Sequence, residues 1–170
     1  IDERMMLRGS VYHGQEKIQT NIALNDVIIT RAGFSRLVEL KIYVNGELLS
    51  IYNADGIIVS TPTGSTGYSL SAGGPIIFPQ TDVMVITPIC PHSLQARSLV
   101  VSGEDRIMIE IGRRRKTQRE EAMVTFDGRS AQELETGDRI EIYKAQETTQ
   151  LIRLKGRSFY QVLQNKIGTA

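Results

Sequence analysis

Short β-branched runs separated by turn pairs constrain this sequence more than any other feature. The strongest turn is Asn45-Gly46, a pair that adopts the positive φ angles of a tight hairpin. Residues 37–44 precede it with alternating apolar side chains, and residues 47–52 can pair back. Comparable strand candidates lie at residues 8–13, 17–24, 27–30, 57–59, 82–87, 99–102, 106–111, 122–126, 131–134, 139–144 and around Leu151 and Arg153. This pattern predicts a layered, antiparallel β architecture.

Helical patterns are few. The sequence has room for one short helix near Tyr68, and Ser158 can cap a final helix that runs to about Lys166. Pro88 and Pro91 predict a stiff turn between strands. The expected fold is therefore mainly β: a multi-stranded, β-sandwich-like domain with a short helix in the middle and a helix at the C-terminus.

Composition excludes several classes of protein. The 170 residues suffice for one domain with a full core, and the net charge of +1 disfavours a nucleic-acid binder. No apolar run reaches transmembrane length, so we expect no membrane partner. The single Cys90 excludes an internal disulfide and fits a reducing cytoplasm. The chain begins at Ile1 rather than Met, so we expect it to be cut from a longer protein.

Residues 54–75 carry the densest functional signal. The turn Asp55-Gly56 leads into an apolar run at residues 57–59, and residues 60–67 are small, polar and flexible. Gly64 and Gly67 would let a ligand approach the main chain, and Ser65 or Thr66 could cap the following helix. These features predict an anion site, although a plain connecting loop has the same composition. The Walker, Rossmann and Gly-x-Ser-x-Gly patterns are all absent.

Three segments together resemble the NAD kinase family. Residues 61–68 read TPTGSTGY, continue as SLSAGGP, and look like the signature loop of that family. Residues 23–27 (ALNDV) resemble its Asn-Glu/Asp motif, and residues 88–94 (PICPHSL) resemble a third motif, in the expected order. The resemblance spans nearly the whole chain, but only the C-terminal domain of the family.

The resemblance implies a set of residues that contact the dinucleotide. They are Asn25, Asp26, Asp55, Thr66, Gly67, Tyr68, Ser71 and Asp127. In this set the Asn25 amide suits an adenine edge, the Asp26 carboxylate suits ribose hydroxyls, and Asp55 is implied near the nicotinamide. Thr66, Tyr68 and Ser71 are implied at the adenosine. Asp26 stands where the family often has Glu, and Gly67 where Ala is common.

Simpler interpretations stand beside these. Asn25-Asp26 and Asp127-Gly128 could be ordinary turns, Asp55 a turn carboxylate, and Tyr68 a core ring. His92 and Cys90 are interpreted as structural. The basic cluster, defined as Arg113, Arg114, Arg115, Lys116 and Arg119, could face phosphates or form a solvated hairpin tip.

The activity implied by the resemblance is ATP-dependent phosphorylation of the adenosine-ribose 2′-hydroxyl of NAD, giving NADP. It requires ATP with Mg²⁺ or another divalent cation. In the family, an N-terminal α/β domain with a Gly-Gly-Asp-Gly motif supplies the catalytic groups. Here the only Gly-Gly pair, Gly73-Gly74, is followed by Pro75. We therefore expect no catalytic residue or metal ligand in this chain, and no activity from the chain alone.

The resemblance also implies partners: NAD, ATP, the protein's own N-terminal domain, and further copies in a homodimer or homotetramer. Two other functions compete with this interpretation. A β-rich domain of a related lipid kinase would present an apolar mouth rather than Asn25, Asp26 and hydroxyl groups. A non-enzymatic module that contacts nucleic acid through the basic cluster would show steep salt dependence, and the net charge of +1 disfavours it.

Overall fold

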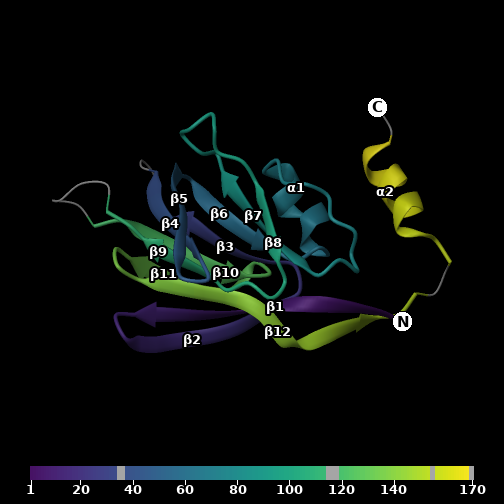
Figure 1. Cartoon of the computed structure of the whole chain (residues 1–170), viewed down its shortest axis with the longest axis horizontal. Coiled ribbons are helices and arrows are strands. Elements are labelled where there is room, and N and C mark those ends of the chain that lie inside the picture. Colours follow the sequence, from purple (N-terminus) through teal and green to yellow (C-terminus); the bar gives the residue numbers. More distant parts are fainter. Residues whose placement is uncertain (34–36, 114–118, 154–155, 169–170) are drawn as a thin grey trace.

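A computed structural model describes residues 1–33, 37–113, 119–153 and 156–168, and shows two six-stranded antiparallel sheets (Figure 1). The first sheet has the order β2-β1-β12-β9-β4-β5. Its strands are β1 (Asp2–His13), β2 (Glu16–Ala23), β4 (Val38–Val44), β5 (Glu47–Ala54), β9 (Ile107–Ile111) and β12 (Arg139–Leu151). The expected β-sandwich-like fold is confirmed.

The second sheet carries most of the residues singled out in the sequence. Its order is β11-β10-β3-β6-β7-β8. Its strands are β3 (Asp26–Arg31), β6 (Gly56–Ser60), β7 (Val83–Ile89), β8 (Leu99–Ser102), β10 (Glu121–Phe126) and β11 (Arg129–Glu135). Because β3 and β6 are central and antiparallel, the start of β3 meets the end of β6 and the loop that follows it.

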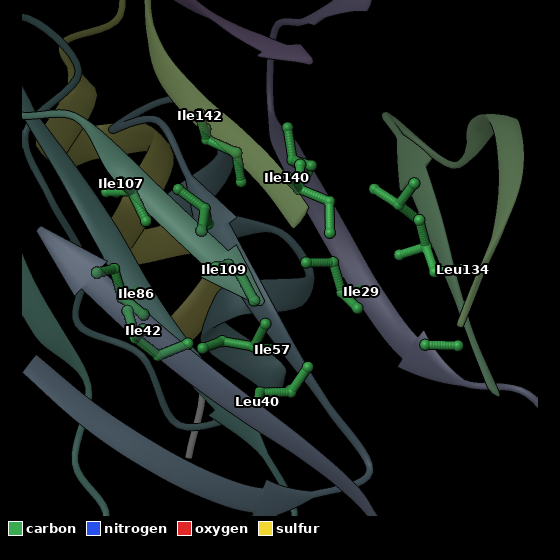
Figure 2. Packing of buried hydrophobic residues seen from close by; sticks show 14 of the residues in the cluster. Ile29, Leu40, Ile42, Ile57, Ile86, Ile107, Ile109, Leu134, Ile140 and Ile142 are labelled. Carbon is green, nitrogen blue, oxygen red and sulfur yellow. The ribbon is translucent and has the colours of Figure 1, made fainter. Parts of the chain in front are cut away.

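Apolar side chains from both sheets form the core between them. Figure 2 shows Ile29 and Ile57 of the second sheet near Leu40, Ile42 and Ile109 of the first, and all five are fully buried. Alternation along each strand sends every second side chain inward, which is why β-branched runs with period two form these layers.

The Asn45-Gly46 hairpin forms as the sequence predicts. Asn45 and Gly46 take φ angles of 51° and 83°, and β4 pairs with β5 around them. These left-handed conformations suit the right-handed twist of the flanking strands. The turn fixes the register that buries Val38, Leu40 and Ile42 on one face of β4.

Two strand predictions were wrong. The segments near residues 139–144 and Leu151 are one strand, β12, which crosses an irregularity where its pairing with β1 shifts between Met5 and Leu7. The polar interruption in the sequence is this bulge rather than a break.

Pro88 lies within β7, opposite Ile57. Pairing of β7 with β8 ends at Ile86, so the missing N–H of Pro88 costs no hydrogen bond to β8.

In the described part of the chain, two helices complete the fold, with a 3₁₀ turn at Gly64–Thr66 before the first. They are α1 (Tyr68–Ser71), which follows that turn, and α2 (Phe159–Ile167). As predicted, Ser158 caps α2: its side chain accepts from Gln161 N, and the Gln161 side chain accepts from Ser158 N. No described helix is long and apolar enough to cross a membrane.

Candidate functional site

Thr61 fastens the loop after β6 to the turn before β3. Its backbone N–H donates to the Asn25 carbonyl at 2.9 Å, and its hydroxyl donates to the Leu24 carbonyl at 2.7 Å. The same hydroxyl accepts from Gly64 N at 3.0 Å. Thr61 is fully buried, so these bonds are shielded from water. The loop and the turn therefore form one rigid unit.

Gly64 packs directly against that turn, which corrects its predicted role. A Cβ at this position would overlap the Asn25 carbonyl group and lie 2.8 Å from Asn25 Cα. The absent side chain therefore makes room for the protein's own backbone rather than for a ligand. Gly67 differs: it is exposed, and a Cβ there would approach only Gly64 O, at 3.3 Å.

The predicted helix cap is also wrong. Gly67 occupies the N-cap of α1, and no side chain caps the helix. The Ser65 hydroxyl instead donates to the Pro62 carbonyl at 2.7 Å and accepts from Ile77 N at 3.0 Å. With only four residues, α1 has too small a dipole to hold an anion. The anion site predicted from its N-terminus is therefore not supported.

Asp127 holds the turn from the opposite side. Its carboxylate accepts three backbone N–H groups, from Leu24 and Asn25 at 2.7 Å and from Asp26 at 3.1 Å. Its own N–H donates to the Asp26 carbonyl at 3.0 Å, and its φ of 49° shows that it sits in a tight turn. The structure thus shows Asp127 as an organiser of the turn, while direct contact with a ligand stays a prediction.

The Asp26 carboxylate lies in an electrostatically unfavourable environment. The residue is only 6% exposed, and no described residue donates a hydrogen bond to its side chain. Burial, aided by the charge of Asp127, raises the pKa of the Asp26 carboxyl to about 6. Beside it, the Asn25 side chain is exposed and forms no hydrogen bond within the described chain. The turn therefore offers one acceptor that lacks donors and one free amide.

The face of β3 turned away from the core connects this turn to a second cluster. Val27 and Ile29 point into the core, so Asp26, Ile28 and Thr30 lie on the opposite face. From Asp26 to Thr30 this row spans about 14 Å, at roughly 3.4 Å per residue. The row ends beside Asp55, because the Arg31 N–H donates to the Asp55 carbonyl at 2.9 Å.

The second cluster lies around Asp55. Asp55 Oδ1 accepts from Arg31 Nε at 2.9 Å, and both side chains are about one-third exposed. A hollow of about 320 Å³ opens here, and Asp55, Arg31, Thr30 and Tyr68 contribute to its lining. Tyr68 is 43% exposed, which rules out the interpretation of its ring as core.

The eight predicted residues thus fall into four groups. Asn25, Asp26 and Asp127 form the turn, and Asp55 shares its hollow with Tyr68. Thr66 lines a different hollow, on the other side of the loop. Gly67 and Ser71 are exposed on or next to α1.

Sequence reasoning missed two supporting residues. Thr61 belongs to the signature loop but was not assigned a role, and Arg31 follows directly after a β-branched run. A buried threonine that opens a glycine-rich loop is a usable signal for such a fastening role. No local pattern indicates that Arg31 meets a carboxylate 24 residues further along the chain.

Most of the basic cluster, residues 114–118, lies outside the described residues. Of its ends, Arg119 forms an exposed ion pair with Glu135 at 3.3 Å. Within the described ranges no group of three or more His, Cys, Asp or Glu side chains could hold a metal ion. These described residues therefore do not fit a resident metal.

Comparison with protein families identifies a match over most of the chain. Residues 24–154 match the model of the ATP-NAD kinase C-terminal domain. The chain is 50% identical over 170 residues to an NAD kinase of Lachnoclostridium phytofermentans, covering 99% of this chain and 60% of that protein. It is 47% identical over 176 residues to an NAD kinase of Lachnospira eligens, covering 98% and 60%. The chain therefore spans about three-fifths of the length of these relatives.

Two solved structures with the same fold are also longer than this chain. A yeast NADH kinase complexed with NADH superposes with a TM-score of 0.76 and 35% identity, over 84% of this chain and 40% of that one. An NAD kinase from Archaeoglobus fulgidus in complex with ATP gives a TM-score of 0.69 and 26% identity, over 86% and 53%.

Proposed function

Because the chain belongs to the NAD kinase family, we propose that it is the dinucleotide-binding part of an enzyme that forms NADP from NAD. One observation carries this proposal. The buried Asp26 carboxylate lacks donors in the described chain and lies beside the free amide of Asn25. A nucleoside supplies what both side chains lack: ribose hydroxyls for Asp26 and an adenine edge for Asn25.

The ligand would lie along the outer face of β3. With the adenosine ribose at Asp26, the row through Ile28 and Thr30 leads to the hollow at Asp55. We therefore place the nicotinamide end near Asp55. Tyr68 lines the same hollow, so we propose it there rather than at the adenosine, where the family resemblance implies it. Thr66 and Ser71 would border the adenosine from the loop and α1, as the family resemblance implies, and Gly67 would contact the dinucleotide between them.

Asp127 acts in this proposal as a positioning residue. Its carboxylate fixes three consecutive N–H groups, so the side chains of Asn25 and Asp26 start from a set backbone. Holding recognition groups in place before binding reduces the entropy that binding costs. The negative charge of Asp127 also strengthens the need of Asp26 for donors, because it raises the pKa of that carboxyl.

The proposed reaction is transfer of the γ-phosphoryl group of ATP. The adenosine-ribose 2′-oxygen forms a bond to the γ-phosphorus, the bond from that phosphorus to the ADP oxygen breaks, and the hydroxyl proton leaves. We propose that an N-terminal α/β domain with a Gly-Gly-Asp-Gly motif supplies the group that takes the proton. That motif does not occur in this sequence. The divalent cation would accompany the ATP phosphates.

From this division of labour we expect the 170-residue chain alone not to phosphorylate NAD. Incubation with ATP, Mg²⁺ and NAD, followed by a dehydrogenase assay for NADP, measures this directly. A longer protein in which these residues follow a Gly-Gly-Asp-Gly domain is the matched positive control. Turnover by the chain that equals the control would place the proton acceptor within these residues.

Binding of NAD is the direct test of the proposal. Calorimetric titration of the chain should show binding that weakens about tenfold for Asn25→Ala and more for a double change that adds Asp26→Ala. Asn165→Ala, at an exposed position of α2, is the matched control and should leave the affinity unchanged. Unaltered affinity in the double variant would overturn the assignment of the site.

We also propose that the protein is cytoplasmic and assembles with copies of itself. The edge strand β5 leaves Leu48, Leu49 and Ile51 exposed by 53%, 44% and 48% beside the Asn45-Gly46 hairpin. An exposed edge with apolar side chains favours pairing with another copy across a two-fold axis. Light scattering should find a species of twice the 18.9 kDa chain mass or more, and Leu49→Lys should reduce it to the monomer.

A further inference from the structure

Ser60, the last residue of β6, carries a buried hydroxyl without a hydrogen-bond partner. The residue is fully buried, and within the described ranges no group forms a hydrogen bond with its Oγ. The hydroxyls that follow it differ, since those of Thr61 and Ser65 each donate to a main-chain carbonyl at 2.7 Å. A buried hydroxyl without a partner costs free energy, so we expect Ser60 to gain one in some state of the protein.

The side chain of Ser60 lies on the same face of the second sheet as that of Asp26. Ile57 and Val59 of β6 point into the core, so alternation along the strand puts Ser60 on the opposite face. The strands β3 and β6 are antiparallel, and their register sets Ser60 directly opposite Asp26. The two side chains are therefore cross-strand neighbours on one face.

The hydrogen-bond pattern shows which kind of pair these two residues form. At the next position of the register, Thr61 N donates to the Asn25 carbonyl at 2.9 Å, which makes that pair a hydrogen-bonded one. Hydrogen-bonded and non-hydrogen-bonded pairs alternate along an antiparallel ladder, so Asp26 and Ser60 form a non-hydrogen-bonded pair. Side chains approach most closely in such pairs, with Cβ atoms about 4.5–5.5 Å apart. Rotation about χ1 then brings the hydroxyl within hydrogen-bond distance of the carboxyl group.

Asp26 lacks what the Ser60 hydroxyl can supply. The residue is 6% exposed, and no described group donates a hydrogen bond to its carboxyl. Burial, aided by the charge of Asp127 at the end of β10, raises the pKa of this carboxyl to about 6. On the other side, residues 56–67 contain no ionisable side chain. A hydroxyl donor from that side would favour the ionised form of the carboxyl, which is the form that accepts ribose hydroxyls.

We propose that Ser60 is a positioning residue of the dinucleotide site, whose hydroxyl donates to the ionised Asp26 carboxylate and fixes its orientation toward the ribose. The inference rests on the proposed function for the identity of the ligand. A carboxylate accepts about four hydrogen bonds, so one oxygen can take the Ser60 hydroxyl while the other takes the ribose. Ser60 is fully buried, so it acts through Asp26 rather than by touching the dinucleotide.

A hydroxyl that only fills space would behave differently when it is removed. Ser60→Ala deletes one oxygen atom that has no hydrogen-bond partner in the described chain. Removing such an atom should leave the protein as stable as before, or more stable. The positioning role predicts that the same change weakens the binding of the dinucleotide. Loss of affinity without loss of stability is therefore the expected signature.

Calorimetric titration of the 170-residue chain with NAD, paired with urea unfolding, tests this signature. Ser60→Ala should weaken NAD binding about tenfold at pH 7, without lowering the urea midpoint. Ser10→Ala is the matched control, because Ser10 is also buried in a strand but its hydroxyl is bonded to that of Thr20 at 3.0 Å. It should lower the urea midpoint and leave NAD affinity unchanged. In an Asp26→Ala background, Ser60→Ala should cause no further loss of affinity.

A titration without ligand measures the contact between the two side chains. Nuclear magnetic resonance of the ¹³C-labelled carboxyl gives the pKa of Asp26 in each protein. This pKa should be higher in Ser60→Ala than in the native chain, because a donor to the ionised form has been lost. Ser10→Ala should leave it unchanged. Ser60→Cys keeps a weaker donor of similar size, so its Asp26 pKa and its NAD affinity should be intermediate.

The two measurements distinguish failure of this inference from failure of the proposed function. An unchanged NAD affinity, an unchanged Asp26 pKa or a lower urea midpoint in Ser60→Ala would overturn the positioning role. A chain that does not bind NAD, but whose Asp26 pKa rises in Ser60→Ala, would overturn the proposed function and leave the contact between hydroxyl and carboxylate standing.

Discussion

The two ends of β3 are built in opposite ways. At the start of the strand, the Asn25–Asp26 turn is held by Asp127 from one side and by Thr61 and Gly64 from the other. At the far end, Asp55 is held by backbone bonds and one partly exposed ion pair to Arg31. One end is fixed by several hydrogen bonds and a close contact with Gly64, and the other opens to a hollow at the surface.

This difference matches the chemistry that we propose for each end. The reacting hydroxyl belongs to the adenosine ribose, so the fixed turn would hold the group whose position matters most for transfer. The nicotinamide end takes no part in the bond changes, and an open hollow there can accept it with less demand on geometry. The following predictions test whether the fixed end is as constrained as the contacts indicate.

The largest effect should come from Gly64→Ala. The added Cβ overlaps the Asn25 carbonyl group, and backbone cannot move aside as a side chain can. We expect a loss of about 3 kcal/mol in the free energy of unfolding, measured in urea. Gly67→Ala is the matched control: its Cβ meets only Gly64 O, at 3.3 Å, and should cost less than about 1 kcal/mol. Equal costs at the two glycines would mean that the turn yields.

Asp26 should make stability depend on pH. The pKa of the Asp26 carboxyl is about 6 in the folded state, against an ordinary value of 3.8. Between these two pH values the folded protein therefore holds a proton that the unfolded chain has released. The resulting stability is complete below pH 3.8 and is lost as pH rises through 6. The loss should be about 2–3 kcal/mol.

Asp26→Asn is the control for that prediction, because it cannot titrate. Urea unfolding of both proteins at half-unit steps from pH 4 to pH 8 gives the difference in stability directly. The variant should become the more stable protein, relative to the native one, as pH rises. A difference that stays constant with pH would show that folding does not raise the pKa of the Asp26 carboxyl.

Asp127→Asn should have a smaller but compound effect. Asparagine tolerates the positive φ but offers one acceptor oxygen where the carboxylate offers two. We expect a loss of about 1–2 kcal/mol in unfolding free energy and a weaker affinity for NAD. Nuclear magnetic resonance should also show a lower pKa for Asp26, since one cause of its rise has gone. Unchanged NAD affinity would argue against a positioning role.

The smallest effect should come from the open end. Arg31→Gln removes an ion pair whose two side chains are about one-third exposed, so its cost in unfolding free energy should be below about 1 kcal/mol. The same urea measurements apply, with Lys41→Gln as a control because it removes another partly exposed pair, to Glu110. A cost comparable to that of Asp127→Asn would erase the contrast between the two ends.

Much of the fold could be predicted from local patterns. The Asn45-Gly46 hairpin, the buried run at residues 57–59 and the capped helix after Ser158 each depend on neighbours in sequence. The joining of β12 across its bulge could not be predicted, because the partner that carries the strand onward is β1, at the other end of the chain.

The residues of the candidate site also divide into those that sequence motifs indicated and those whose roles depend on the fold. Motif resemblance indicated Asn25, Asp26 and Asp127, but not that the third would hold the backbone of the first two. Gly64 was interpreted as room for a ligand because sequence cannot show what fills the space beside a glycine. The hollow that Thr66 lines gave no signal, since Arg4, Arg153 and Arg157, which also line it, are joined only by the fold.

The most direct test of the account is a pair of amide chemical-shift titrations of the ¹⁵N-labelled chain, one with NAD and one with adenosine monophosphate. NAD should shift the amides of Asn25 and Asp26 together with those of Asp55 and Tyr68. Adenosine monophosphate should shift the first pair and leave the second unchanged. Shifts by the monophosphate at Asp55 and Tyr68 without shifts at Asn25 and Asp26, or shifts by NAD confined to other strands, would contradict the placement of the dinucleotide along β3.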